Sequence, residues 1–235
     1  MKNRIWELDA FRGLCIWGMV FVHLVFDLTF LTDLVQWDYP DWFVLLQDWG
    51  GVLFLLLSGI CVTLGSHPIR RGLIVFGCGM LCTVVTLVMA HLNMMSSILV
   101  IRFGVLHCLG LCMLLYPAVR RLHPGVVLAL GLTLAFIGLY FRTLTVENPW
   151  LFPLGLVNRG FSSGDFFPLL PNFGFFLVGA ALGKWIYREK RTLFPKSDPR
   201  NFLRRFLCWT GRKSLWIYLA HQPLLAGLCL LLQSR

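Results

Sequence analysis

The chain has 235 residues, of which 57% are hydrophobic and 14% are charged, with a formal net charge of +10. Its mean hydropathy is +0.74. Soluble domains carry about 25% charged residues, and one of this length cannot hide so much apolar surface in a single core. The composition therefore excludes an ordinary soluble protein and predicts an integral membrane protein.

The apolar residues form seven long runs, each near the roughly 20 residues that a helix needs to cross a bilayer. Because a spanning chain must satisfy its backbone groups internally, we predict an all-α, polytopic bundle of about seven transmembrane helices. The first run is too long for a cleavable signal peptide, so we expect it to be retained. The predicted spans are Leu14–Leu31, Phe43–Gly65, Gly72–His91, Ile98–Pro117, Gly125–Phe141, Phe167–Tyr187 and Ser214–Leu232.

The basic residues lie in alternate connectors between these runs. Positive residues favour the cytoplasmic side of a membrane, so we predict a cytoplasmic N-terminus. Because the positive charge is spread over several connectors, we expect no nucleic-acid partner. The connectors predicted to be cytoplasmic contain Lys2, Arg4 and Arg12, then Arg70 and Arg71, then Arg120 and Arg121, and finally the basic stretch from Lys184 to Lys213.

We predict a single domain over residues 1–235, with an interfacial cytoplasmic segment at 189–210. Phe202, Leu203, Phe206 and Leu207 alternate there with arginines, which is typical of a helix lying in the membrane interface. The basic stretch Arg188–Lys213 has two readings that do not exclude one another. It sets the topology and contacts anionic lipids, or it is a docking surface for an anionic cofactor.

The first run carries Asp9, Arg12, His23 and Asp27, separated by 3, 11 and 4 residues. Eleven residues make almost three helical turns, so all four side chains project from roughly one face. Ionisable groups inside a bilayer are costly and usually mark a function. We therefore expect this face to point into the bundle rather than toward lipid.

Three more ionisable residues lie in later predicted spans: Arg102, His107 and His221. Arg102 and Asp27 fall at a similar depth and are candidates for an intramembrane ion pair. Each histidine has an alternative reading as a side chain that only hydrogen-bonds between helices. For His221 we expect a water-mediated bond to a backbone carbonyl freed by the nearby Pro223.

The eight cysteines show no metal-ligand spacing, so we expect no metal. Cys78 and Cys82, like Cys108 and Cys112, are four residues apart, which places each pair on one helix face. Small residues with this spacing usually serve helix packing.

At the first run a resemblance becomes visible. RIWELDAFRGLCIWGMVFVHLVFDL, residues 4–28, resembles the first span of bacterial proteins related to heparan-α-glucosaminide N-acetyltransferase. The shared elements are the stretch Leu8–Gly13 and the apolar helix that follows. The same outline, with Asp9, Arg12 and a histidine near the end of the helix, resembles the acyltransferase-three membrane family. Later blocks, IRFGVLHCLGL, DFFPLLPNFGFFLVGAALGK and GRKSLWIYLAHQPLL, extend the resemblance over nearly the whole chain.

The resemblance implies an enzyme that moves an acetyl or other acyl group from cytoplasmic acyl-CoA to a hydroxyl or amine acceptor, such as a sugar or glycan, across the membrane. We expect His23 and Asp27 to be catalytic, with His23 as general base or acyl-accepting nucleophile and Asp27, one turn on, orienting its imidazole. Arg12, Asp9, Arg212 and Lys213 are candidates for binding acyl-CoA. Arg102, His107, His221 and Asp165 are candidates for binding the acceptor.

One departure from the heparan enzymes concerns the connector after the first span. Those enzymes are known for a catalytic histidine there, whereas Thr32–Trp42 contains none, so we assign no catalytic residue to that loop. As further expectations, the protein lies in a bacterial inner (plasma) membrane, contacts membrane lipids and forms a homodimer. Two alternatives stay open: a transporter or proton relay without acyl transfer, and a haem protein using His23, His107 and His221.

Overall fold

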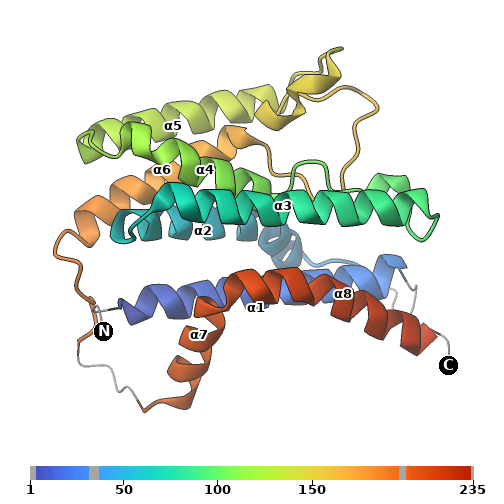
Figure 1. Cartoon of the computed structure of the whole chain (residues 1–235), viewed down its shortest axis with the longest axis horizontal. Coiled ribbons are helices and arrows are strands. Elements are labelled where there is room, and N and C mark those ends of the chain that lie inside the picture. The colour runs from blue at the N-terminus through green and yellow to red at the C-terminus, as the bar shows by residue number, and fades with distance from the viewer. Residues whose placement is uncertain (1–3, 32–36, 196–199, 234–235) are drawn as a thin grey trace. The chain divides into compact units, whose positions relative to one another are not determined.

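The structure is a computed structural model that describes residues 4–31, 37–195 and 200–233. These residues form α-helices joined by short π and 3₁₀ segments (Figure 1). The elements in chain order are α1 (Trp6–Phe26), η1 (Asp27–Leu31), α2 (Asp41–Leu64), α3 (Pro68–His91), η2 (Ser97–Leu99), α4 (Val105–Val119), α5 (Pro124–Phe141), η3 (Pro149–Leu154), α6 (Leu169–Ile186), α7 (Phe202–Arg212) and α8 (Ser214–Gln233).

Five helices in the described residues are long and apolar enough to cross a membrane. The all-α, multi-pass class is therefore confirmed, while the count of seven spans and the cytoplasmic N-terminus remain predictions. Helix α4 is apolar but has only 15 residues. The five candidate spans are Trp6–Thr29, Asp41–Leu64, Pro68–His91, Pro124–Phe141 and Leu169–Ile186.

The chain divides into two compact units. Unit 1 contains Met1–Phe54 and Glu189–Arg235, and unit 2 contains Leu55–Arg188. Helix α2 begins in unit 1 and ends in unit 2. The single domain expected from the sequence remains a prediction.

In unit 1, helix α1 packs against both α7 and α8. The contact with α7 is close because glycines lie on both helices. A Cβ atom on Gly13 would overlap the carbonyl of Leu207, and one on Gly211 would overlap the carbonyl of Asp9. Trp17 and Phe206 stack beside this contact, with ring centroids 5.7 Å apart. Backbone therefore meets backbone along the α1–α7 contact.

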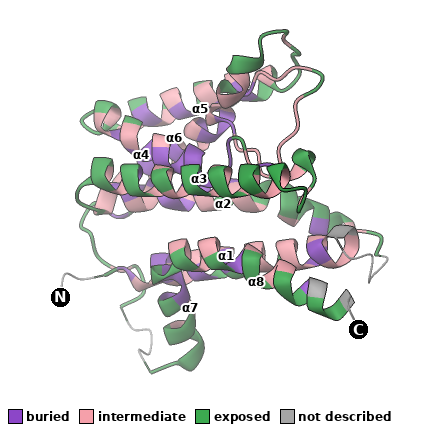
Figure 2. Cartoon of the chain, turned by 45° about the vertical axis from the view of Figure 1, so that its right-hand side comes forward, coloured by how far each residue is buried: buried purple, intermediate pink, exposed green. Residues whose placement is uncertain are grey.

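In unit 2, α3 packs on α4 and α5 packs on α6. The second half of α2 lies against α6, where a Cβ atom on Gly59 would overlap the carbonyl of Phe176. Figure 2 shows that buried residues gather on α4 and α6, whereas much of α3 is exposed. Apolar exposed residues of α3, such as Leu73 and Leu81, are the surface expected of a helix that meets lipid.

Two element boundaries differ from the sequence prediction. The first helix begins at Trp6, so Asp9 and Arg12 lie within it and not just before it. The fourth helix begins at Val105 and not at Ile98, so Arg102 is not helical. The later start of the fourth helix is explained by polar side chains that cap it, which are described below. Helix α7 begins inside the predicted interfacial segment 189–210 and extends beyond it to Arg212. Residues 196–199 of that segment are outside the described residues.

Candidate active site

The polar face of α1 has two ends with different surroundings. At the first end, Asp9 is buried and pairs with two arginines: its carboxylate lies 3.6 Å from Arg12 Nη1 and 3.5 Å from Arg4 Nε. Arg12 precedes Gly13, and Arg212 follows Gly211, so both flank the close α1–α7 contact. This end of the face is a cationic cluster arranged around one buried carboxylate.

His23 lies on the other half of the face. Its Nδ1 is 2.9 Å from the backbone carbonyl of Met19. A carbonyl oxygen only accepts, so Nδ1 carries the proton in this bond. In the neutral ring, Nε2 is therefore unprotonated and keeps its lone pair. This is the tautomer that a general base or nucleophile at Nε2 requires.

His221 of α8 repeats this arrangement opposite His23. Its Nδ1 donates to the carbonyl of Tyr218, so its Nε2 also keeps a lone pair. The two imidazole rings are 4.8 Å apart between centroids and nearly perpendicular. His221 is 93% buried, and its Nε2 has no hydrogen-bond partner. The water-mediated bond to a carbonyl freed by Pro223 stays a prediction, since the direct bond is to the carbonyl of Tyr218.

Asp27 lies one turn after His23, where α1 changes into the π-helix η1. It is fully buried and accepts from the side-chain amide of Gln222, at 2.9 and 3.2 Å. Because a carboxylate can only accept, the Gln222 NH₂ group must face it, which leaves Gln222 Oε1 buried and without a partner. Two neighbouring residues of α8 thus each present an unmatched acceptor beside α1.

The third histidine, His107 of unit 2, is different. Its Nδ1 accepts from the Gly104 N–H at 3.2 Å. Thr83 Oγ1 donates to the carbonyl of Ile101, so it accepts from His107 Nε2 at 3.2 Å. Both ring nitrogens are therefore matched, in the opposite tautomer. Gly79 provides the room for this ring, since a Cβ atom there would meet it at 3.0 Å.

Asp165 and Arg102 also lie at this end of α4. The Asp165 carboxylate accepts from the Val105 N–H at 3.0 Å, which caps the start of α4. Together with His107 it explains why the helix begins at Val105. Arg102 is exposed, its backbone N–H donates to Ser163, and its guanidinium lies 5.9 Å from the Phe161 ring centroid. The ion pair predicted between Arg102 and Asp27 joins residues of different units and remains a prediction.

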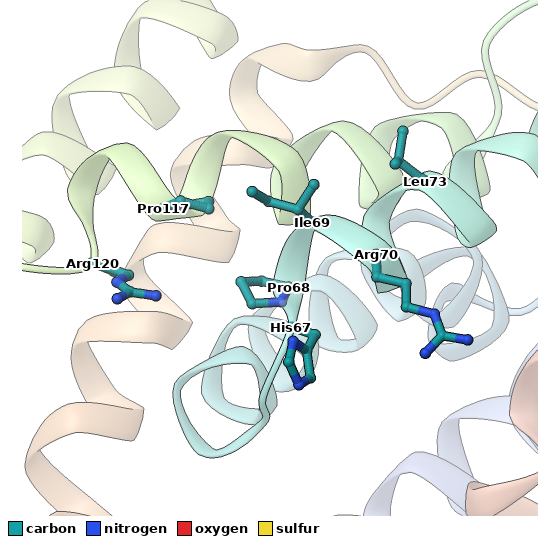
Figure 3. Close-up of a pocket in the computed structure, with 7 residues that line it drawn as sticks. All are labelled: His67, Pro68, Ile69, Arg70, Leu73, Pro117 and Arg120. Carbon is teal, nitrogen blue, oxygen red and sulfur yellow. The ribbon is translucent and has the colours of Figure 1, made fainter.

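Unit 2 also contains a pocket of about 480 Å³ between the start of α3 and the end of α4. Figure 3 shows His67, Pro68 and Arg70 at the start of α3 and Pro117 and Arg120 at the end of α4. Arg70 and Arg120 lie on opposite sides of Pro68 in this view. Both arginines come from the connectors for which the charge pattern predicts a cytoplasmic position.

Comparison with known families identifies the family of the chain. The profile of the family described as heparan-alpha-glucosaminide N-acetyltransferase, catalytic, matches residues 4–223. The chain belongs to this family. No curated protein and no solved structure is similar enough to be matched. Membership confirms the resemblance seen in the sequence and places the chain among the membrane acetyltransferases.

For a member of this acetyltransferase family, the structure brings together some predicted site residues and separates others. His23, Asp27 and His221 lie together in unit 1, whereas His107 and Asp165 both cap α4 in unit 2. Asp27 was expected to orient the imidazole of His23, but the structure gives that bond to the Met19 carbonyl. The rings of His23 and His221 are in contact, which leaves no room for a porphyrin between them.

Two groups of residues were missed by the sequence analysis. Gln222 holds Asp27, and the only signal for it was its place between His221 and Pro223, inside a predicted span. The pocket formed by His67, Arg70 and Arg120 needs two connectors to meet in space. The arginine pairs marked both connectors, but they were assigned only to topology.

Proposed function

We propose that the chain transfers an acyl group from acyl-CoA to a hydroxyl or amine acceptor, with Nε2 of His23 as the base. The observation that carries the proposal is the bond from His23 Nδ1–H to the Met19 carbonyl. It fixes the ring in the tautomer whose Nε2 lone pair is available, on the face that meets α8.

The proposed reaction needs one proton to move twice. His23 Nε2 takes the proton of the acceptor O–H or N–H as that atom attacks the thioester carbonyl. The C–S bond then breaks, and the thiolate leaves with the proton that the imidazolium returns. An alternative use of the same lone pair is direct attack on the thioester, which leaves the acyl group on Nε2 until the acceptor removes it.

The phosphate groups of acyl-CoA need cations to bind them, and two places in the structure supply such cations. In unit 1, Arg12, Arg212 and Lys213 flank the α1–α7 contact beside Asp9. In unit 2, Arg70 and Arg120 line the pocket. Arginine binds phosphate oxygens through paired N–H donors. We place acyl-CoA on the cytoplasmic side and the acceptor on the outer side, as the family resemblance implies.

The test is transfer of label from radiolabelled acetyl-CoA by purified protein in lipid nanodiscs, with sugar and amine acceptors. In His23→Asn, the new amide nitrogen can still donate to Met19 but has no counterpart of Nε2. Loss of a general base lowers rates by about 10²–10⁴-fold, and we expect a fall in this range. His91→Asn is the matched control, because His91 is exposed at the end of α3.

Full transfer activity in a folded His23→Asn protein would overturn the assignment of the base. Label that stays on wild-type protein without acceptor would favour attack by Nε2 on the thioester. If no acyl group is transferred from any acyl donor to any acceptor, the protein is better explained as a transporter than as an enzyme.

A further inference from the structure

The α1–α8 contact in unit 1 offers hydrogen-bond acceptors to an incoming molecule. His23 Nε2 and His221 Nε2 both have lone pairs, because each Nδ1–H is used by a carbonyl of its own helix. Gln222 adds Oε1, because its NH₂ group is used by Asp27. His221 Nε2 and Gln222 Oε1 are buried and have no partner.

Buried polar atoms without a partner are rare in folded proteins, since each costs the desolvation of a group that water would have satisfied. Here two occur on adjacent residues, next to the ring of the proposed base. Both are held in this state by bonds that fix their orientation, so neither is relieved by rotating a side chain. Such a pair calls for O–H or N–H donors from a bound molecule.

We infer that His221 and Gln222 select the acceptor by its hydrogen-bond donors, and that the site takes molecules with at least two neighbouring hydroxyl or amine groups. The inference rests on the proposed function. The group to be acylated donates to His23 Nε2, and its neighbour donates to His221 Nε2. Gln222 Oε1 receives a further donor. His221 is in this account a residue that positions the acceptor.

The same arrangement excludes other classes of acceptor. A monohydric alcohol satisfies His23 and leaves the lone pair of His221 without a partner. An anionic group brings further lone pairs next to those of both histidines and next to the buried carboxylate of Asp27. Sites built to hydrogen-bond a substrate group reject analogues lacking it more strongly than apolar pockets reject a change of size.

Three ring compounds of similar size separate the effect of the number of hydrogen-bond donors from the effect of the number of oxygen atoms. They are trans-cyclohexane-1,2-diol, 2-methoxycyclohexanol, which keeps both oxygens but only one donor, and cyclohexanol. With radiolabelled acetyl-CoA in nanodiscs, we expect the diol to be acylated about 10–100-fold more efficiently than the methoxy ether. The methoxy ether and cyclohexanol should differ little from one another.

Two variants test which atoms create the preference. His221→Asn keeps a donor for the Tyr218 carbonyl and removes Nε2. Asp27→Asn allows the two amides to reverse, so that Gln222 Oε1 is satisfied from within the protein. Each should lower the ratio of the rate of acyl transfer to the diol over the rate of transfer to the methoxy ether. An equal rate with diol and ether in the wild type, or an undiminished preference in both variants, overturns the inference.

A binding measurement separates this inference from the proposed function. The diol should raise the melting temperature of the wild-type protein more than the methoxy ether does, and His221→Asn should abolish the difference. If acetyl-CoA is not consumed but this difference is found, the proposed function fails and the donor-selective site stands. If acetyl-CoA is consumed and the two compounds bind and react alike, the proposed function stands and this inference fails.

Discussion

The histidines of the two units show how one residue type is used in opposite ways. In unit 1, His23 and His221 give their Nδ1 protons to carbonyls of their own helices and keep Nε2 lone pairs. In unit 2, His107 accepts at Nδ1 from Gly104 and donates at Nε2 to Thr83. The first arrangement leaves a reactive atom, and the second uses the whole ring for structure.

The difference follows from where each histidine lies on its helix. His107 is in the first turn of α4, where backbone N–H groups lack partners inside the helix and a side-chain acceptor is needed. His23 lies in the last turn of α1 and His221 in the interior of α8, where the nearby backbone groups are carbonyls. Position on the helix therefore selects the tautomer, and the tautomer decides which nitrogen is available.

The contrast between His107 and His23 would fail if a His107 variant lost activity in the way expected of a His23 variant. His107→Leu leaves the Gly104 N–H without its partner and removes one of the two hydrogen bonds of Thr83 Oγ1. A buried group left unmatched costs about 1–3 kcal/mol. We expect a loss of about 2–4 kcal/mol in stability, measured as a lower melting temperature in nanodiscs, with acyl transfer per folded molecule retained. His23→Asn should do the reverse. Loss of transfer without loss of stability in His107→Leu would restore the acceptor-binding role predicted from the sequence.

Two glycines on α1 provide a test of the close packing in unit 1. Gly13→Ala would drive a methyl group into the Leu207 carbonyl, whereas Gly18 has open space around it. Overpacking costs about 1–3 kcal/mol, while alanine is favoured over glycine within a helix by roughly 0.5–1 kcal/mol. We therefore expect Gly13→Ala to lower the melting temperature and Gly18→Ala to leave it equal or higher. Equal effects of the two changes would contradict the close α1–α7 contact.

A thiol on α7 reports on the same contact. Cys208 is buried and donates to the carbonyl of Trp6. Burial raises the pKa of the Cys208 thiol, and the nearby Asp9 carboxylate acts in the same direction, so little thiolate forms near neutral pH. In a protein whose other cysteines are serine, we expect slow labelling by a maleimide, and faster labelling once Gly13→Ala loosens α7. Rapid labelling without that change would show that α7 leaves α1 readily.

The two cationic places in the two units predict different effects on donor binding. If unit 1 binds the phosphates, Arg212→Gln with Lys213→Gln should raise KM for acetyl-CoA about tenfold, at an unchanged kcat. Arg70→Gln with Arg120→Gln should then have a smaller effect. The opposite order would assign the donor phosphates to the pocket of unit 2. No change in KM with either pair would remove both from the donor site.

Much of this fold could be predicted from sequence, because lipid makes simple demands on a spanning helix. The apolar runs predicted the helical, multi-pass class, and the Leu8–Gly13 stretch with three later blocks indicated the family. The start of α4 was missed because it depends on Asp165, which lies 60 residues away from the Val105 N–H that it caps. The role of Gln222 was missed for the same reason, since its partner Asp27 lies 195 residues away. Spacing along one helix cannot report such pairs.

The central claim, that His23 and His221 keep free Nε2 atoms while His107 does not, is tested most directly by ¹⁵N NMR of histidine-labelled protein in lipid. Single His→Asn variants assign the three residues. The account predicts protonated Nδ1 and unprotonated Nε2 for His23 and His221, and the reverse for His107. A protonated Nε2 on His23 in the neutral ring would contradict it, because the proposed base would then have no lone pair to offer.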